Sequence, residues 1–87
     1  AEAIRGTLDE ETVESPLYYR VQVGAFRNRE NADRLVYQLT DKEFPAFLLY
    51  EDGFYKVQVG AFLQLGNAIR MEQRLRDAGY STVIVTK

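Results

Sequence analysis

An eight-residue segment occurs twice in this chain, and the repetition limits the possible folds more than any other feature. Residues 19–26 read YRVQVGAF and residues 55–62 read YKVQVGAF. The offset of 36 residues continues beyond the octets, because Asn31-Ala32 recurs as Asn67-Ala68. A fixed period of this length indicates one supersecondary unit that is used twice.

Within the first octet, side chains of two kinds alternate. Tyr19, Val21 and Val23 share one parity, whereas Arg20 and Gln22 share the other. Since successive side chains of a strand point to opposite faces, each octet predicts a strand with one apolar and one polar face.

Turn and helix signals between the octets predict the remaining elements. Asn28 is a suitable helix N-cap, Pro45 follows the end of that helix, and Asp52-Gly53 is a strong hairpin signal. We expect Gly24 and Gly60 to end the two repeated strands, where the chain must turn. In chain order the prediction is a strand over 18–24, a helix from 28 to 41–43, strands over 46–50 and 54–60, a helix over 65–78 and a strand over 80–86.

This order of elements is β-α-β-β-α-β. Two β-α-β halves with right-handed crossovers give an α+β fold of the ferredoxin-like or RNP-like type. We expect a four-stranded antiparallel sheet in the order 4-1-3-2, with both helices on one face. The two repeated octets become the central strands, related by an internal two-fold axis.

Composition narrows the chemistry that the chain can support. Its 87 residues are enough for one small domain, and they include no cysteine and no histidine. Disulfides and thiolate metal sites are excluded, and the commonest general base and metal ligand are missing. With no nucleophile–base pair to place, we expect a binding domain that is not an enzyme and has no cofactor.

Charge divides the chain at about residue 16. Residues 1–16 carry five acidic side chains and one arginine, a net charge of -4, so the remainder has about +2. We interpret 1–16 as an acidic linker or tail, with a short helix around 8–13 as one option, and 17–87 as the folded domain. Such weak basicity does not favour nucleic-acid binding, and no apolar run approaches the ~20 residues of a membrane span.

Two helices cover only one face of such a sheet, and the other face should lie open. The residues expected to face the helices are Tyr19, Val21, Val23, Tyr55, Val57 and Val59. Those expected on the open face are Tyr18, Arg20, Gln22, Phe54, Lys56 and Gln58, joined by Phe47, Leu49, Val83 and Val85 of the outer strands. An apolar floor around two amides suits a ligand with hydroxyl or acetamido groups. The alternative is an ordinary solvated face, and one bulge would invert the alternation on which the prediction rests.

Other polar features have simpler interpretations. Glu51 and Asp52 are adjacent carboxylates in a turn, not a catalytic pair across a cleft. Asn31 and Asn67 are expected to form hydrogen bonds in the first turns of the helices. Met71 is expected in the core. Arg27 and Arg29 are expected to be solvated, with contact to an anionic group as the alternative.

The doubled Val-Gln-Val-Gly-Ala-Phe motif, followed each time by Asn-Ala, resembles the SPOR (sporulation-related repeat) family over residues 17–87. The chain is most similar to the carboxy-terminal cell-wall-binding domains of sporulation N-acetylmuramoyl-L-alanine amidases. The resemblance implies binding of peptidoglycan glycan strands that lack stem peptides. It also implies a monomer in the cell envelope that brings an attached hydrolase, or a division or sporulation protein, to the septum or wall.

The resemblance also implies which residues bind. The family's binding glutamine falls on Gln22, with Gln58 as its copy, and further family positions fall on Ala25, Phe26, Phe54 and Phe47. Strand alternation adds three predicted binding residues on the same face, Tyr18, Arg20 and Lys56. The two cations among them are suited to binding a muramic lactyl carboxylate. Some relatives carry tryptophan on this face, whereas this chain has none. An RNA-binding domain and a protein-interaction module are the alternative functions that the open sheet face allows.

Overall fold

The computed structural model describes residues 17–86, so the tail over 1–16 and its suggested helix lie outside the described residues. Six elements follow one another in the predicted order. They are β1 (Tyr19–Phe26), α1 (Arg29–Asp41), β2 (Ala46–Glu51), β3 (Phe54–Phe62), α2 (Leu65–Asp77) and β4 (Val83–Thr86).

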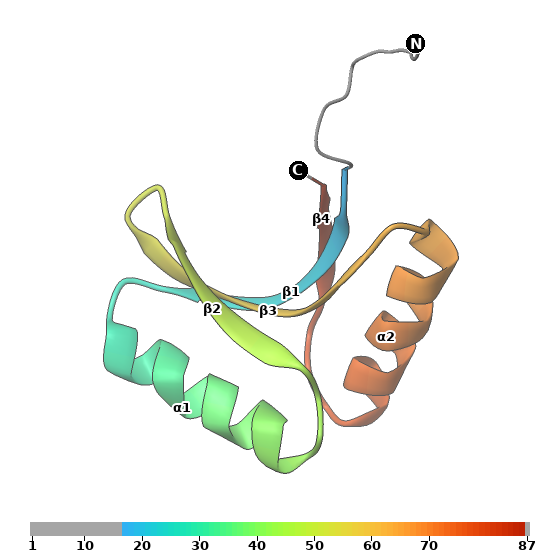
Figure 1. Ribbon diagram of the computed structural model, residues 1–87. Helices are drawn as coiled ribbons and strands as arrows, with labels where there is room; N and C mark the ends of the chain where they lie inside the picture. The colour runs from blue at the N-terminus through green and yellow to red at the C-terminus, as the bar shows by residue number, and fades with distance from the viewer. Residues whose placement is uncertain (1–16, 87) are drawn as a thin grey trace, which may run out of the picture.

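The four strands form one antiparallel sheet in the order β2-β3-β1-β4, which confirms the predicted topology. Figure 1 shows a strongly curved sheet with α1 and α2 on its convex side. The β2–β3 hairpin and β4 rise at opposite ends of the concave side (Figure 1). The repeated octets are the two central strands, so the concave face is built on the most regular part of the sequence.

Local signals fix the ends of the elements. The Asn28 side chain accepts a hydrogen bond of 2.8 Å from the Glu30 amide and caps α1 as predicted. Asp52 and Gly53 both have positive φ, at 57° and 81°, as a two-residue hairpin turn requires. Gly79, with φ of 96°, follows the end of α2.

The core lies between the sheet and the two helices. Its fully buried members come from both halves of the repeat and include Val21, Val57 and Val59 of the central strands. Tyr19, Val23 and Tyr55 pack against this cluster, so all six side chains predicted to face the helices do so. Met71 is also in the core, as expected.

The two glycines of the repeat do not end their strands, which corrects the prediction. β1 continues to Phe26 and β3 to Phe62. Each glycine instead lies at a shift in the β1–β3 register. In β3, Gly60 has no partner, because Ala61 pairs with Arg20 and Val59 with Val21. In β1, Val23 has no partner, because Gln22 pairs with Gln58 and Gly24 with Val57. These shifts are β-bulges, and Gly60 has the positive φ, 75°, that a bulge of this kind uses.

The bulges change which face the residues after them occupy. After the bulge at Val23, Ala25 pairs with Lys56 and Phe26 pairs with Tyr55. Phe26 therefore lies on the helix side and packs against the core. A Cβ at Gly24 would lie 2.9 Å from the Phe26 ring, and one at Gly60 would lie 2.7 Å from the Phe62 ring. In each half of the repeat the phenylalanine therefore covers the glycine two residues before it.

The fourth strand is shorter than predicted, because it begins at Val83 instead of Tyr80. It pairs only with residues 19–22 of β1, so β1 extends beyond the end of its neighbour. Neither helix in the described part of the chain has the length and apolar character needed to cross a membrane.

Candidate functional site

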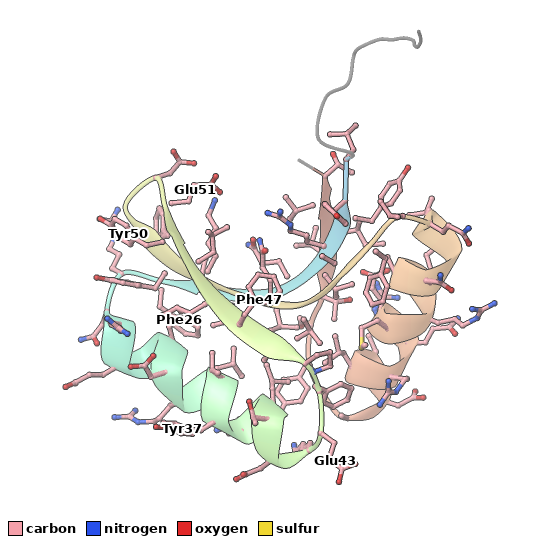
Figure 2. All side chains as sticks on the ribbon, viewed as in Figure 1. Phe26, Tyr37, Glu43, Phe47, Tyr50 and Glu51 are labelled. Atoms are coloured by element: carbon pink, nitrogen blue, oxygen red, sulfur yellow. The ribbon has the colours of Figure 1, made fainter. Side chains whose placement is uncertain are left out.

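The concave face of the sheet, opposite the helices, is the candidate site (Figure 2). A row of paired residues crosses all four strands at its middle. In strand order the row is Phe47, Gln58, Gln22 and Val83. The two ends of the row are apolar and accessible, with Phe47 37% exposed and Val83 53% exposed, whereas the centre is polar.

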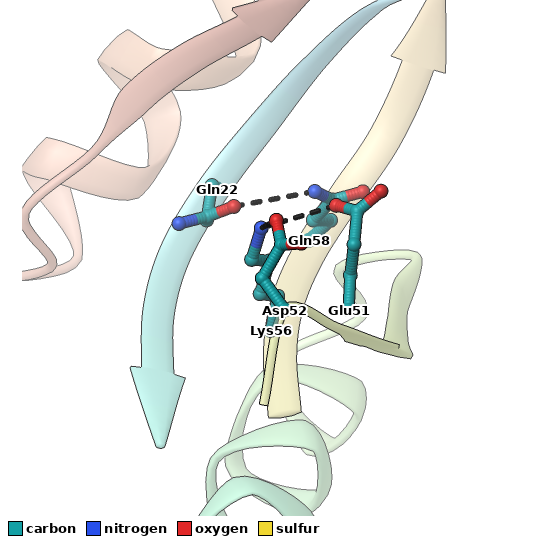
Figure 3. Close-up of polar contacts among 5 residues, drawn as sticks. All are labelled: Gln22, Glu51, Asp52, Lys56 and Gln58. Atoms are coloured by element: carbon teal, nitrogen blue, oxygen red, sulfur yellow. Dashed lines mark hydrogen bonds and ion pairs between the residues drawn. The ribbon is translucent and has the colours of Figure 1, made fainter. Parts of the chain in front are cut away.

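The two glutamines at the centre are bonded to each other. The Gln58 amide nitrogen donates to the Gln22 side-chain oxygen over 3.3 Å (Figure 3). Gln58 is only 2% exposed, and its Oε1 has no hydrogen-bond partner. Gln22 is half-buried and keeps its amide nitrogen for other partners. Gln58 therefore holds the Gln22 side chain in place, and Gln22 is the member of the pair that a ligand can reach.

Lys56 lies on the same face but is already engaged. Its Nζ is 3.0 Å from a carboxylate oxygen of Glu51 and 3.8 Å from one of Asp52 (Figure 3). The Lys56 side chain is 20% exposed and that of Glu51 28%, so the closer contact is partly shielded from water. The two-residue hairpin places Glu51 diagonally across from Lys56, and the pair therefore rigidifies one end of the face.

Arg20 is the counterpart of Lys56 in the first half of the repeat, and its surroundings differ. It lies between Ala61 of β3 and Val85 of β4. Its Nε is buried and has no hydrogen-bond partner, and no acidic side chain among residues 17–86 forms an ion pair with it. Arg20 is therefore a half-buried cation that is not paired with any carboxylate of the described residues.

The four remaining predicted site residues lie in different surroundings. Ala25 is exposed on the open face, opposite Lys56. Phe54 shares the face but lies under the Arg27 guanidinium, which is 5.0 Å from the ring centroid. Tyr18 is half-buried and precedes β1. Phe26 is not on the open face, because the bulge turns it toward α1 (Figure 2).

A groove opens where β1 runs beyond the end of β4. Its volume is about 270 Å³. One wall is residues 22–25 of β1 and the other is residues 81–83, just before and at the start of β4. This part of β1 has no strand partner on that side, and the lining of the groove is mainly apolar.

A polar cluster holds the second wall of the groove in place. The Thr82 hydroxyl donates to the Glu72 carboxylate over 2.9 Å, and Arg76 contacts both residues. Glu72 is 9% exposed, so these hydrogen bonds satisfy a buried charge. The cluster ties the segment before β4 to α2.

Sequence reasoning missed this groove, because it assigned Ser81 and Thr82 to the interior of a strand. The sequence did carry a signal for the groove. The last apolar run, residues 83–85, is shorter than the strand β1 with which it pairs.

In the part of the chain that the structure describes, the open face offers hydrogen bonds, apolar surface and cations without an ion-pair partner, which are means of binding a ligand without reacting with it. Among residues 17–86, no group of three or more acidic side chains is arranged to hold a metal ion. The carboxylates of Glu51 and Asp52 point at Lys56, as a turn pair does, and not at each other across a cleft.

Comparisons with known proteins agree with this geometry. The SPOR domain family matches residues 15–86. The solution structure of the peptidoglycan-binding domain of the B. subtilis cell wall lytic enzyme CwlC superimposes with a TM-score of 0.75 and 38% sequence identity, over 90% of this chain and 98% of that one. A search of curated protein sequences finds no match.

Proposed function

The chain belongs to the SPOR domain family, and from that membership and the geometry of its open face we propose that it binds peptidoglycan. It does so as a non-catalytic module, formed by residues 17–87, that recognises glycan strands from which the stem peptides have been removed. Residues 1–16 are the linker or tail of this module. The likeness to the CwlC domain, which binds peptidoglycan, supports the ligand class.

The observation that carries the proposal is the row of residues across the concave face. A glycan strand presents hydroxyl and acetamido groups along its edges and apolar faces on its rings. The Gln22 amide, held by its hydrogen bond to the buried Gln58, is the polar group at the centre of the face, and Phe47 and Val83 supply apolar contacts on either side. This alternation of polar and apolar contacts matches the two kinds of surface that a sugar chain offers.

The shape of the face favours glycan without stem peptides. The concave floor is bounded by the β2–β3 hairpin at one end and by β4 at the other (Figure 1). A peptide on each muramic residue would compete for this limited space. Removal of the peptides therefore relieves a steric conflict.

Such a module acts by localisation. Because the floor is shallow, affinity comes from several sugar units in contact at once, and an attached cell-wall hydrolase or division or sporulation protein is retained where stripped glycan accumulates. This places the domain in the cell envelope, at the wall or the septum.

The test is a pull-down with purified sacculi before and after digestion by an N-acetylmuramoyl-L-alanine amidase. We expect the chain to be enriched on the digested sacculi. Gln22→Ala should reduce that binding while its circular dichroism and unfolding midpoint stay close to those of the parent. Equal retention on both kinds of sacculi would contradict the preference for stripped glycan. Binding of single-stranded RNA at physiological salt would favour the RNA-binding alternative.

A further inference from the structure

We propose that Arg20 is the anion-binding group of the open face, and that it binds the lactyl carboxylate that an amidase leaves on N-acetylmuramic acid. The inference rests on the proposed function and deepens it, because it names the sugar that is distinguished. The face would then prefer N-acetylmuramic acid over N-acetylglucosamine, which lacks the lactyl group.

The two halves of the repeat place a cation at equivalent positions, and only one of the two is available. Lys56 is balanced by Glu51 at 3.0 Å and approached by Asp52 at 3.8 Å. Arg20 has no acidic neighbour within ion-pair distance in the part of the chain that the structure describes. An incoming carboxylate would have to displace Glu51 to reach Lys56, whereas Arg20 needs no such exchange.

The immediate surroundings of Arg20 strengthen the case. Its cross-strand neighbours are Ala61 and Val85, which offer no polar atom on their side chains. The residue is half-buried, so its charge is partly shielded from water. A guanidinium presents its donors in a planar fork that matches a carboxylate, so a carboxylate is the group that would satisfy it best.

A second hydrogen-bonding group lies on the same face. Gln22 is half-buried and uses its side-chain oxygen, not its amide nitrogen, in the bond to Gln58. In N-acetylmuramic acid the acetamido carbonyl on C2 is adjacent to the lactyl ether on C3. One sugar therefore offers both an anion for Arg20 and an acceptor for Gln22, whereas N-acetylglucosamine offers the acceptor alone.

The experiment compares three soluble oligosaccharides of equal length by isothermal titration calorimetry with the full chain. The first is stripped glycan, the second is the same glycan with its lactyl carboxylates reduced to alcohols, and the third is a chitooligosaccharide. We expect the parent to bind the first about tenfold more tightly than the other two, as the loss of one charge-assisted hydrogen bond predicts. Arg20→Gln should bind all three with nearly equal affinity, and Arg20→Lys should keep part of the preference.

Arg34→Gln is the matched control, because it removes one arginine from the exposed surface of α1. It should leave the tenfold preference intact. Lys56→Gln should reduce the preference less than Arg20→Gln does, and the reverse order would overturn the inference.

Two further outcomes are distinct. If the parent binds all three sugars equally, the role of Arg20 is refuted while glycan binding stands. If the parent binds none of them, the proposed function itself fails. Carboxyl reduction tests recognition of the carboxylate without any variant. If Arg20→Gln fails to fold, Arg20→Lys tests the guanidinium, and an unchanged preference in that variant would overturn the role of Arg20.

Discussion

The two halves of this domain, β1-α1-β2 and β3-α2-β4, have nearly the same sequence in their first strands but different surroundings on the open face. Against the helices they are alike. Leu39 and Leu75 are both fully buried, and so are Ala32 and Ala68. The Asn31–Arg34 hydrogen bond of α1 returns as Asn67–Arg70 in α2.

On the open face the halves differ. Arg20 has no ion-pair partner among the described residues, whereas Lys56 is paired with Glu51. Gln22 lines a groove, whereas Gln58 is 2% exposed. The reason is the connection of the outer strand: a two-residue hairpin joins β2 to β3, but no hairpin joins β4 to β1. The repeated residues thus form an equivalent core in both halves, and the differences between the halves lie on the proposed binding surface.

Truncation of the core should give the largest effects and should be equal in the two halves. Leu39→Ala and Leu75→Ala each remove a side chain that is 0% exposed and leave a cavity, so each should lower the free energy of unfolding by about 2–5 kcal/mol. Urea denaturation of both variants measures this. A large loss for one and a small loss for the other would contradict the equivalence of the halves.

The bulge glycines should behave less symmetrically. Gly60→Ala places a Cβ at φ of 75° and 2.7 Å from the Phe62 ring, so we expect a loss of about 2–3 kcal/mol. Gly24→Ala meets the Phe26 ring at 2.9 Å without a positive φ, and about 1 kcal/mol is expected. Equal losses in urea denaturation would show that backbone conformation does not separate the two bulges.

The tie between Thr82 and Glu72 exists only in the second half, where the equivalent of Thr82 in the first half is Ala46. Thr82→Val leaves the buried Glu72 carboxylate one donor short and should lower the free energy of unfolding by about 1–2 kcal/mol. Thr82→Ser keeps the hydroxyl and serves as the control. Should the two variants be equally stable, the hydrogen bond is not what holds the groove wall.

The smallest expected difference concerns the helix caps. Asn28→Ala removes the hydrogen bond to the Glu30 amide and should cost about 1 kcal/mol. Gln64 occupies the same position before α2 but makes no side-chain cap, so Gln64→Ala should have almost no effect. Thermal unfolding of the two variants measures the two losses of stability. A larger loss of stability for Gln64→Ala would contradict the conclusion that only Asn28 caps its helix through its side chain.

Much of the fold follows from the sequence because its signals are local. The alternation of Val21, Gln22 and the residues around them, the N-cap at Asn28 and the Asp52-Gly53 turn each specify a few residues of backbone, and the structure confirms them. The parity argument fails only at the glycines, where a bulge adds one residue to a strand and moves Phe26 to the other face.

The details of the site depend on longer-range pairing and were harder to predict. The engagement of Lys56 by Glu51 requires the cross-strand register, although the two-residue hairpin already implies it. The groove depends on where β4 stops pairing with β1 and on the contact between Thr82 and α2. Both involve segments that are distant in the sequence, so local patterns do not predict them.

The most direct test of the central claim is a titration of the ¹⁵N-labelled chain with soluble stripped glycan, followed by amide chemical shifts. The account predicts the largest changes on the concave face and its groove, at Gln22, Phe47, Gln58 and Val83, with α1 and α2 nearly unchanged. Changes concentrated on the helices, or none at saturating glycan, would contradict it.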